Sequence, residues 1–409
     1  MERNLPRLHV TEKAERALKG GHPWVFADEV TAKEGDLANG CLADVFSQKD
    51  RFLGTGFYNE HSKIRLRVIS ANANDRFDEA FFERRLRYAL AYRYTVMGET
   101  DFRCCRLIFG EADHFPGLTV DRFEDVLVAQ VLCLGVEQRK EMLFSLLVRI
   151  LKEDYGVAVR AIYERNDLAL RQKEGLTEGK GFFELPGLTS DPTGLARICE
   201  NGVWYDVDYV NGQKTGFFLD QKYNRLAAAK LARGKKVLDC FTHTGAFALN
   251  AAKAGAAGVT AVDISAEAIE MTRHNAALNG LEGRMQFVCR NVFDLLTELA
   301  ESKSHPYDFI ILDPPAFTKS SATVKNAERG YRDINLRAMR ALPRGGYLAT
   351  CSCSHFMTDE LFCKMLVRAA RDAAVSLRQI EARQQAPDHP VLWNVPETDY
   401  LKFYLFQVV

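Results

Sequence analysis

The stretch K-V-L-D-C-F-T-H-T-G-A-F-A-L-N-A-A-K-A-G at residues 236–255 decides how the C-terminal half of the chain folds. It begins as a short apolar strand that ends at Asp239, and it continues through Gly245 into a helix. A strand that turns directly into a helix is the first unit of a doubly wound sheet, whose ligands bind beyond the carboxyl ends of the strands. A glycine lets the backbone approach a ligand closely, and the N–H groups of the helix start can face it.

The same alternation of strand and helix continues on both sides of this stretch, from about residue 203 onward. Apolar strands are predicted at V-T-A-V-D-I (259–264), M-Q-F-V-C-R (285–290), D-F-I-I-L-D (308–313) and Y-L-A-T-C-S (347–352), with amphipathic helices between them. Strands buried on both faces are apolar along their whole length, as in parallel sheets covered by helices. The fold class predicted here is therefore α/β with a doubly wound parallel sheet.

The first 75 residues have a different pattern, in which short apolar runs alternate with turn residues. This period of two predicts a small β-rich module. In K-I-R-L-R-V-I at residues 63–69, Lys63, Arg65 and Arg67 share one face. That face is either a polar surface in contact with solvent or a basic strip for a nucleic acid.

The middle of the chain reads as a small α+β domain. A helix is predicted over residues 77–94, with Asp78 near its start, and a second helix over 137–155. The segment 172–187 is rich in glycine and charge and is predicted to be a loop or linker. The expected domains are therefore residues 1–75, 76–185 and 186–409.

Composition limits the class of protein. Hydrophobic residues make up 47% and charged residues 26%, and no apolar run approaches the roughly 18–20 residues of a membrane-spanning helix. The N-terminus lacks the apolar core of a secretory signal, and the ten cysteines show no zinc-ligand spacing, so we predict a cytoplasmic protein without a metal. Lys+Arg and Asp+Glu both number 54, which counts against a nucleic-acid partner unless basic residues gather on one face.

Two strand ends predict a nucleoside-containing cofactor. Asp263 stands 24 residues after Asp239, near the spacing of about 20 between a glycine turn and an acid that binds ribose hydroxyls. F-T-H-T-G-A-F is not G-x-G-x-x-G, and its single glycine leaves little room for a pyrophosphate. A sulfonium cofactor of the methionine type carries no phosphate, so it suits this loop better than a nicotinamide dinucleotide does.

The next two strand ends carry a carboxylate and a thiol. Asp313 is followed by two prolines, which stop the strand and stiffen the loop, and Cys353 stands between two serines. Each has a plainer reading, as a strand terminator and as a small buried apolar residue. Beside a methyl donor, however, a thiolate that adds to C6 of a pyrimidine makes C5 nucleophilic, and Asp313 would protonate or hydrogen-bond N3 of a cytosine.

At this point the sequence resembles the class I large-subunit ribosomal RNA methyltransferases that make 5-methylcytosine. The resemblance spans essentially the whole chain. Its most specific elements are HPWVF (22–26), EADHFPGLTVDRF (111–123), NGQKTGFFLDQKYNR (211–225), VLDCFTHTGAF (237–247), DPPAF (313–317) and SCS (352–354). The resemblance implies an N-terminal PUA RNA-binding domain, a small α+β middle domain and a Rossmann-like domain that binds S-adenosylmethionine. It also implies large-subunit ribosomal RNA as the partner.

The resemblance carries roles over by position. Cys353 matches the nucleophile, Asp313 the carboxylate of D-P-P, and Asp263 the ribose-binding acid. The residues expected around the rest of the cofactor are Asp239, Phe241, Thr242, Gly245, Asn291, Gln213, Lys214, Thr215, Phe217, Asp220 and Gln221. Asn291 departs from the family, which often holds an aspartate there, but an amide oxygen can accept the same hydrogen bond from an adenine amino group.

Several alternatives stay open at the level of sequence. Cys351 lies two residues before Cys353 and would share its face if the strand continued. The chain could methylate another base atom, such as a guanine nitrogen. It could also be a non-catalytic RNA-binding assembly factor or, less in keeping with its N-terminal module, a small-molecule methyltransferase. A homodimer is possible.

Overall fold

The computed structural model describes residues 4–191, 193–302, 304–318 and 320–409. The chain forms two compact units. The N-terminal unit comprises the chain up to Ile198 together with Val207–Leu219 and Pro387–Thr398. The C-terminal unit comprises Cys199–Asp206, Asp220–Ala386 and Asp399–Val409. The three-domain division with boundaries after residues 75 and 185 stays a prediction.

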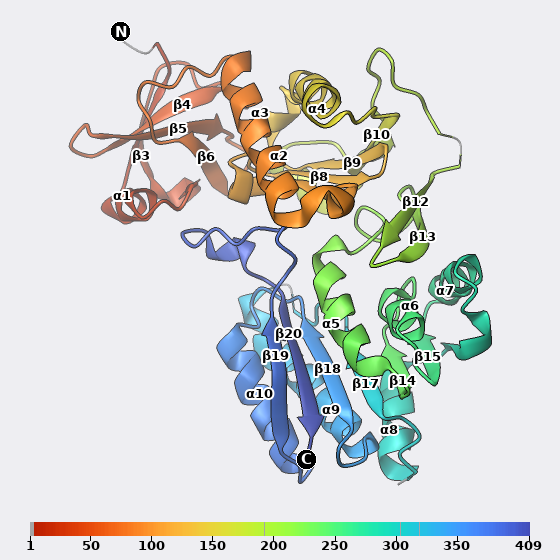
Figure 1. The fold of residues 1–409 in the computed structure, drawn as a ribbon. Coiled ribbons are helices and arrows are strands. Elements are labelled where there is room, and N and C mark those ends of the chain that lie inside the picture. The colour runs from red at the N-terminus through yellow and green to blue at the C-terminus, as the bar shows by residue number, and fades with distance from the viewer. Residues whose placement is uncertain (1–3, 192, 303, 319) are drawn as a thin grey trace. The chain divides into compact units, whose positions relative to one another are not determined.

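The first sheet of the N-terminal unit forms the β-rich module that the sequence predicts (Figure 1). Its strands are β1 (Arg7–Val10), β2 (Trp24–Phe26), β3 (Val30–Glu34), β4 (Leu42–Ser47), β5 (Phe52–Tyr58) and β6 (Ile64–Ser70), and α1 (Glu12–Lys19) follows β1. They lie in the order β2-β6-β5-β4-β1-β3, and β1 and β4 are parallel. Alternate side chains such as Leu8, Val10, Val45 and Leu66 point into one apolar core, which explains the period of two.

The basic face predicted along residues 63–69 is not a continuous surface. Lys63 is exposed and Arg65 is half-buried, but Arg67 is buried. One guanidinium nitrogen of Arg67 lies 2.7 Å from a Glu174 oxygen and the other lies 3.4 Å from a Glu111 oxygen. A buried arginine needs such carboxylate partners. Neither a solvent-facing surface nor a nucleic-acid strip therefore describes Arg67.

A second sheet, with the strand order β11-β10-β9-β8-β7, fills the rest of the N-terminal unit. Its strands are β7 (Cys104–Phe109), β8 (Leu118–Phe123), β9 (Val126–Val131), β10 (Ala161–Asn166) and β11 (Gly179–Phe182), with helices α2 (Glu79–Phe102), α3 (Leu134–Glu137) and α4 (Lys140–Tyr155). The predicted start of α2 is confirmed, because the Asp78 side chain accepts a hydrogen bond from the Phe81 N–H at 3.0 Å. The segment 172–187 is not all loop, since β11 pairs with β10 at the edge of this sheet.

The C-terminal unit is built on the parallel sheet that the sequence predicts. Its strands are β14 (Lys236–Cys240), β15 (Gly258–Asp263), β16 (Met285–Cys289), β17 (Phe309–Leu312), β18 (Tyr347–Ser352), β19 (Leu377–Arg383) and β20 (Lys402–Val408). They lie in the order β16-β15-β14-β17-β18-β20-β19. Strands β14 to β18 are parallel, and β20 runs antiparallel to both β18 and β19. The strand order reverses between β14 and β17, where ligands of such sheets bind.

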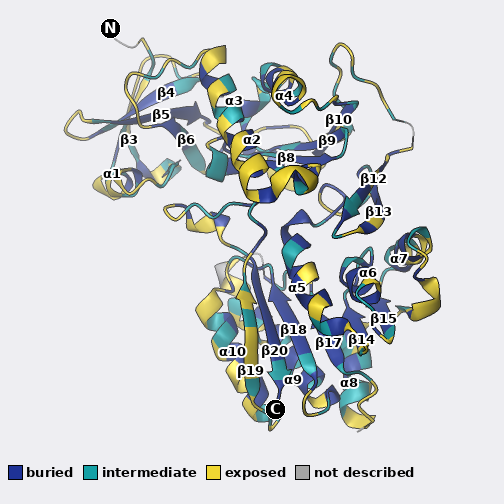
Figure 2. Ribbon diagram, in the orientation of Figure 1, coloured by how far each residue is buried: buried dark blue, intermediate teal, exposed yellow. Residues whose placement is uncertain are grey.

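Helices cover both faces of the central strands of this sheet, which Figure 2 shows as buried, whereas the edge strand β19 is largely exposed. The helices are α5 (Lys222–Ala232), α6 (Ala246–Lys253), α7 (Ala266–Leu278), α8 (Val292–Ser302), α9 (Val324–Ala341) and α10 (Asp359–Asp372). Helices α8, α9 and α10 share one apolar core with Leu238, Cys240, Ile310 and Leu312 of the sheet. Asp239, which lies between two of these residues, therefore points to the opposite face, where α6 lies.

The remaining elements are short. A two-stranded sheet consists of β12 (Leu195–Glu200) and β13 (Val203–Asp208). The 3-10 helices are Ala27–Glu29, Gly110–Asp113, Ala169–Glu174, Leu219–Gln221, Glu282–Arg284, Ser321–Thr323 and Pro396–Thr398.

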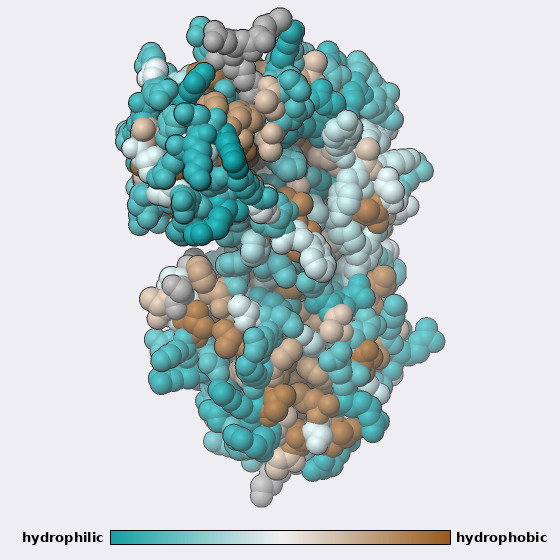
Figure 3. Space-filling view, turned by 90° about the vertical axis from the view of Figure 1, so that its left-hand side faces the viewer, coloured by the Kyte–Doolittle hydropathy of each residue, from teal (hydrophilic) through white to brown (hydrophobic). Residues whose placement is uncertain are grey.

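The two units present different surfaces in the view of Figure 3. Hydrophilic side chains cover most of the visible face of the N-terminal unit, whereas hydrophobic side chains gather in several places on the C-terminal unit. Exposed apolar side chains of the C-terminal unit include Phe356, Val367 and Ile380. In the part of the chain that the structure describes, no helix combines the length and the apolar character that crossing a membrane requires.

Candidate functional site

Three carboxylates gather at the carboxyl ends of β14, β15 and β17. Asp239 is the second-last residue of β14, Asp263 is the last residue of β15, and Asp313 directly follows β17. Parallel strands end at the same edge of a sheet, which brings these side chains close enough for their charges to interact. The pKa of Asp239 is raised to about 7, mainly by burial and also by the charges of Asp313 and Asp263, while its hydrogen bonds act in the opposite direction. We call these residues the strand-end carboxylates.

Asp239 is the most deeply buried of the three. One carboxylate oxygen accepts hydrogen bonds from the Thr242 hydroxyl at 2.6 Å and from the Ala248 N–H at 2.9 Å. The other oxygen is also buried and has no hydrogen-bond partner among the described residues. An unsatisfied buried carboxylate oxygen is costly, so this corner of the site favours a ligand that supplies a donor or a positive charge.

The loop between β14 and α6 has an unusual backbone. Phe241, His243 and Gly245 have φ values of 64°, 52° and 84°, in the left-handed region that side chains with a Cβ rarely adopt. A Cβ at Gly245 would lie 2.6 Å from Thr272 of α7. The sequence predicted that this glycine makes room for a ligand, but its nearest constraint is the packing of the loop against α7. Backbone strain of this kind persists where the surroundings hold it and is frequent at binding sites.

Asp263 holds the same loop from the next strand. Its two carboxylate oxygens accept hydrogen bonds from the His243 N–H at 2.9 Å and the Ser265 N–H at 3.0 Å. Each oxygen of a carboxylate has a second lone pair, so an oriented Asp263 can still accept from the hydroxyls of a diol. At the end of the third strand, the Asn291 side-chain oxygen accepts from the Phe293 N–H at 2.8 Å and thus caps the start of α8.

A chain of hydrogen bonds leads from Asp313 to the last strand residue of β19. Gln221 donates from Nε2 to Asp313 Oδ1 at 3.1 Å, and Asn224 donates from Nδ2 to Gln221 Oε1 at 2.7 Å. Arg383 donates from Nε to Asn224 Oδ1 at 3.1 Å. An arginine can only donate, so it sets which end of each amide faces inward. We call this series the amide relay; each of its donors points toward the Asp313 carboxylate.

The two neighbouring cysteines have different surroundings. Cys351 lies within β18, is fully buried, and is hydrogen-bonded to Gln221 and Asp313. Burial and the nearby Asp313 charge raise the pKa of the Cys351 thiol well above its ordinary value, which makes it a poor thiolate. Cys353 follows the end of the strand and is half-buried, so the strand does not continue through it. Negative charge on Cys353 also raises the pKa of the Cys351 thiol.

A buried lysine lies beside Cys353 and was not among the residues that the sequence pointed to. Lys402 begins β20, is 6% exposed, and donates from Nζ to the carbonyl oxygens of Ser354 at 2.7 Å and Tyr400 at 2.8 Å. Burial lowers the pKa of Lys402 to about 8, and the charge of Cys353 acts in the opposite direction. The only signal in the sequence is a single lysine within the apolar run L-K-F-Y-L-F, which marks a charge inside a buried strand.

Other predicted cofactor residues lie in different parts of the structure. Gln213, Thr215 and Phe217 belong to the N-terminal unit, where the Thr215 hydroxyl donates to Asp121 at 2.6 Å. Asp220 belongs to the C-terminal unit and accepts a hydrogen bond from the Tyr400 hydroxyl at 2.7 Å. The predicted site residues from β14 to β18 thus lie together in the C-terminal unit, whereas Gln213, Thr215 and Phe217 lie in the N-terminal unit.

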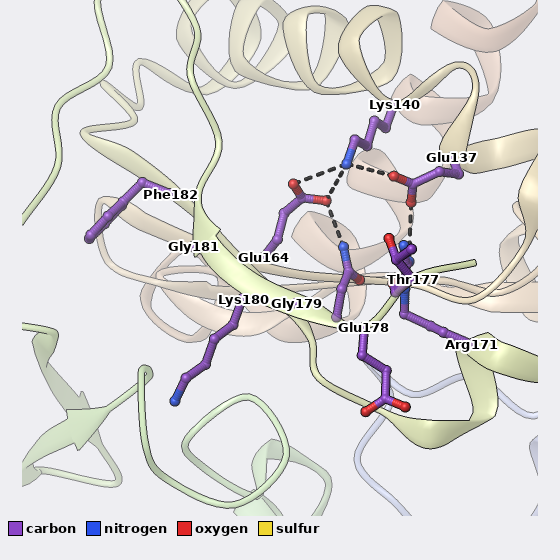
Figure 4. A pocket seen from close by; sticks show the side chains of 11 residues that line it. Glu137, Lys140, Glu164, Arg171, Thr177, Glu178, Gly179, Lys180, Gly181 and Phe182 are labelled. Atoms are coloured by element: carbon purple, nitrogen blue, oxygen red, sulfur yellow. Dashed lines mark hydrogen bonds and ion pairs between the residues drawn. The ribbon is translucent and has the colours of Figure 1, made fainter.

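The N-terminal unit has a separate polar pocket of about 270 Å³ between α4, β10 and β11, which we call the β10–β11 pocket (Figure 4). Lys140 contacts Glu137 at 2.7 Å and Glu164 at 2.9 Å, and Arg171 contacts Glu137 at 3.1 Å. Lys140 and Arg171 are therefore paired with the glutamates of this pocket. In the described parts of the chain, no group of three or more His, Cys, Asp or Glu side chains is arranged to hold a metal ion.

Comparison with known families gives two matches. Residues 115–407 match the model of an S-adenosylmethionine-dependent methyltransferase family, and residues 8–71 match the model of a PUA-like domain. The second match covers the six-stranded sheet except for Arg7, and the first covers the seven-stranded sheet except for Val408. The Rossmann-like fold and the N-terminal PUA-like domain predicted from the sequence are confirmed.

Similar proteins cover almost the full length. The chain is 39% identical over 405 residues to "Ribosomal RNA large subunit methyltransferase I" of Klebsiella pneumoniae, which covers 99% of this chain and 98% of that protein. It is 41% identical over 397 residues to the protein of the same name from Aeromonas hydrophila, with 97% of each chain covered. Among solved structures, a proposed SAM-dependent methyltransferase from Streptococcus mutans has a TM-score of 0.80 at 23% identity and covers 98% of this chain and 100% of its own.

Proposed function

We propose that this chain, which belongs to the S-adenosylmethionine-dependent methyltransferase family, methylates C5 of a cytosine in large-subunit ribosomal RNA through a covalent adduct on Cys353. The observation that carries the proposal is that Cys353 lies close enough to Lys402 for their charges to interact. Cys353 also interacts electrostatically with Cys351, and Cys351 is hydrogen-bonded to Asp313. The names of the relatives supply the substrate class.

The strand-end carboxylates fit S-adenosylmethionine. The cofactor carries a positive sulfonium and a positive ammonium group, and it supplies an electrophilic methyl group. Asp239 and Asp313 put negative charge next to each other, and the unsatisfied Asp239 oxygen can accept a hydrogen bond from a cationic donor. We propose that Asp263 accepts hydrogen bonds from the ribose hydroxyls and that Phe241, Thr242 and Gly245 line the methionine part. Asn291 is proposed to face the adenine.

In the proposed chemistry, Cys353 is the nucleophile and Cys351 is not. The half-buried Cys353 is accessible, and the cationic form of Lys402 stabilises its thiolate. The thiolate forms a bond to C6 of the cytosine, and the C5–C6 π electrons make C5 nucleophilic. After C5 has gained its methyl group, a base removes the C5 proton, the C6–S bond breaks, and the electron pair returns to sulfur.

We propose that Asp313 interacts with N3 of the cytosine ring. As the thiolate adds to C6, the C5–C6 π electrons shift so that negative charge develops at C5 and N3, and an adjacent carboxyl can supply a proton or a hydrogen bond at N3. The amide relay holds the Asp313 side chain in one orientation through Gln221. This contact makes Asp313 a group of fixed geometry, as proton transfer at a defined ring atom requires.

RNA binding is proposed to involve the PUA-like domain, with residues 1–75 and 76–185 as separate domains ahead of the catalytic one. Enzymes that act on a base need it unpaired or turned out of a helix, because its reactive atoms are otherwise covered. A ribosomal RNA substrate also implies that the protein is located in the cytoplasm.

The test is trapping with RNA that contains 5-fluorocytidine. Fluorine at C5 cannot leave as the proton does, so a Cys353 adduct should persist as a slower-migrating protein–RNA band in a denaturing gel. Cys353→Ala should abolish both the band and turnover while cofactor affinity changes by no more than a few-fold. Cys351→Ala serves as the matched control and should still form the band.

The outcomes separate the alternatives. Methylation of RNA without any adduct would indicate transfer to another base atom. Failure of the purified protein to bind S-adenosylmethionine would favour a non-catalytic assembly factor. Mapping of 5-methylcytosine in ribosomal RNA from cells with and without the protein identifies the nucleotide.

A further inference from the structure

The connection between β19 and β20 contains a segment, Pro387–Thr398, that belongs to the N-terminal unit. Its base is held by buried polar contacts. The fully buried Arg93 donates to the Asp388 carbonyl at 3.1 Å, and the Arg106 N–H donates to the Asp388 carboxylate at 2.8 Å. These contacts fix where the segment begins.

The tip of the segment is a tight turn that is held on both sides. The Val395 N–H donates to the Leu392 carbonyl at 2.8 Å, and the Leu392 N–H donates to the Thr398 hydroxyl at 2.9 Å. Val395 is fully buried. The Asn394 side chain donates to the Gly21 carbonyl at 2.5 Å. The backbone on either side of the turn therefore has little freedom to move.

Trp393 occupies this turn and is 96% exposed. Turn positions usually hold Gly, Pro, Asn, Asp or Ser, and a tryptophan is rarely left almost wholly in water. For comparison, Trp204 is 47% exposed, and Trp24 is half-buried with its indole N–H hydrogen-bonded to Glu111 at 3.0 Å. Trp393 is thus an aromatic side chain on a turn whose backbone is held in place, and the fold does not use its ring for its own core.

We propose that Trp393 is a stacking platform for an unpaired nucleobase of the RNA substrate. The inference rests on the proposed function, which makes RNA the partner. Single-stranded RNA is commonly bound by stacking of its bases on aromatic side chains, and a tryptophan loses little conformational entropy when it is covered. Because the turn is anchored to Gly21, Trp393 extends the RNA-binding role proposed for the PUA-like domain.

The surroundings of Trp393 favour a base over a protein partner. Protein interfaces centre on clusters of apolar side chains that bury a large area. In the same segment Asn394 is exposed, and the exposed Glu397 lies 3.2 Å from the ring nitrogen Nε2 of the half-buried His22. Val391 and Leu392 are half-buried and Val395 is buried, so the ring is not part of an apolar patch within the segment. One flat ring among polar groups matches the size of one base.

The experiment compares the affinities of wild type, Trp393→Ala and Trp393→Phe for protein-free large-subunit ribosomal RNA at one fixed salt concentration. Loss of a stacked base should weaken binding of Trp393→Ala by about 5- to 100-fold, whereas Trp393→Phe should keep most of the affinity. Trp204→Ala is the matched control and should bind as wild type does. S-adenosylmethionine affinity and the melting temperature should be unchanged in both Trp393 variants, because the Trp393 ring is 96% exposed and makes no core contact.

Tryptophan fluorescence supplies a second readout with a cytidine-rich single-stranded RNA of about ten nucleotides. Stacking should quench the emission of wild type and of Trp204→Ala, and the quench should be largely lost in Trp393→Phe. Equal ribosomal RNA affinity of wild type and Trp393→Ala would overturn the platform and leave the proposed function intact. If wild type itself does not bind ribosomal RNA, both proposals are wrong.

Discussion

The strand-end carboxylates and the β10–β11 pocket are both rich in charged side chains, but their charges are balanced differently. In the pocket, Lys140 contacts both Glu137 and Glu164, so these three side chains pair opposite charges. At the strand ends, the charges of Asp263 and Asp313 both act on Asp239, and one Asp239 oxygen has no hydrogen-bond partner among the described residues. Charged side chains that pair with one another have no need of a ligand, whereas a buried carboxylate without a partner is typical of a binding site.

The largest expected effect comes from removing the acid of the strand-end site. Asp313→Asn should lower kcat by about 10²- to 10⁴-fold, because an amide cannot supply the proton that a carboxyl does. The measurement is single-turnover methylation of the RNA. Glu164→Gln in the β10–β11 pocket is the control and should retain wild-type kcat. Equal losses in both variants would mean that the two regions do not differ in function.

The amide relay should give the next largest effect. Arg383→Met removes the donor at its outer end, and kcat should fall by about ten-fold to a hundred-fold because Asp313 is then less well oriented. Arg383→Lys keeps a donor and should recover part of the rate. Steady-state kinetics should show the change in kcat with little change in KM for RNA. A positioning role is contradicted if KM alone rises or if the lysine variant is no better than methionine.

Asp239 predicts a pH dependence of stability in the cofactor-free protein. Its folded pKa of about 7 is above the ordinary value of 3.8, so from about pH 4 to pH 7 the unfolded chain has released a proton that the folded chain still holds. Stability from this group is fully present below pH 4 and is lost as pH rises through 7, by up to about 4 kcal/mol.

Chemical denaturation at pH 5 and pH 8 tests this direction. Asp239→Asn cannot titrate, so its free energy of unfolding should fall less than that of wild type between the two pH values. Glu164→Gln should retain the wild-type difference. An unchanged pH dependence in Asp239→Asn would show that Asp239 is not the group responsible.

The smallest effect is expected in the β10–β11 pocket. Lys140→Met removes the cation between two glutamates, and since this pair is partly exposed, the loss should be about 1 kcal/mol of unfolding free energy. Turnover should not change. A drop in turnover without a drop in stability would give the pocket a functional role that its paired charges do not suggest.

The comparison also shows what could be read from the sequence. The five parallel strands β14 to β18 were predictable because each is a continuous apolar run, whereas β19 and the antiparallel β20 were not predicted. Asp239, Asp263 and Asp313 could be singled out because they stand at the ends of such runs. Topology alone brings these ends to one edge. The roles assigned to them and to Cys353 are still predictions.

The partners of these residues were not predictable, because they come from distant parts of the chain. Arg383 and Asn224 are 159 residues apart, and Arg67 and Glu174 are 107 residues apart. No local period links such pairs; only the packed structure brings them together. For the same reason the sequence did not show that Arg67 is buried, since its partners Glu111 and Glu174 lie in two 3-10 helices far along the chain.

The direction of the amide relay has an energetic consequence. Water beside a carboxylate must reorient whenever the charge on that group changes, and this reorganisation adds to an activation barrier. The dipoles of Gln221 and Asn224 cannot reverse while Arg383 occupies the outer end, because a flipped amide would turn its N–H groups toward a guanidinium that has no acceptor. The solvation of Asp313 on this side is therefore permanent and preorganised before any substrate arrives.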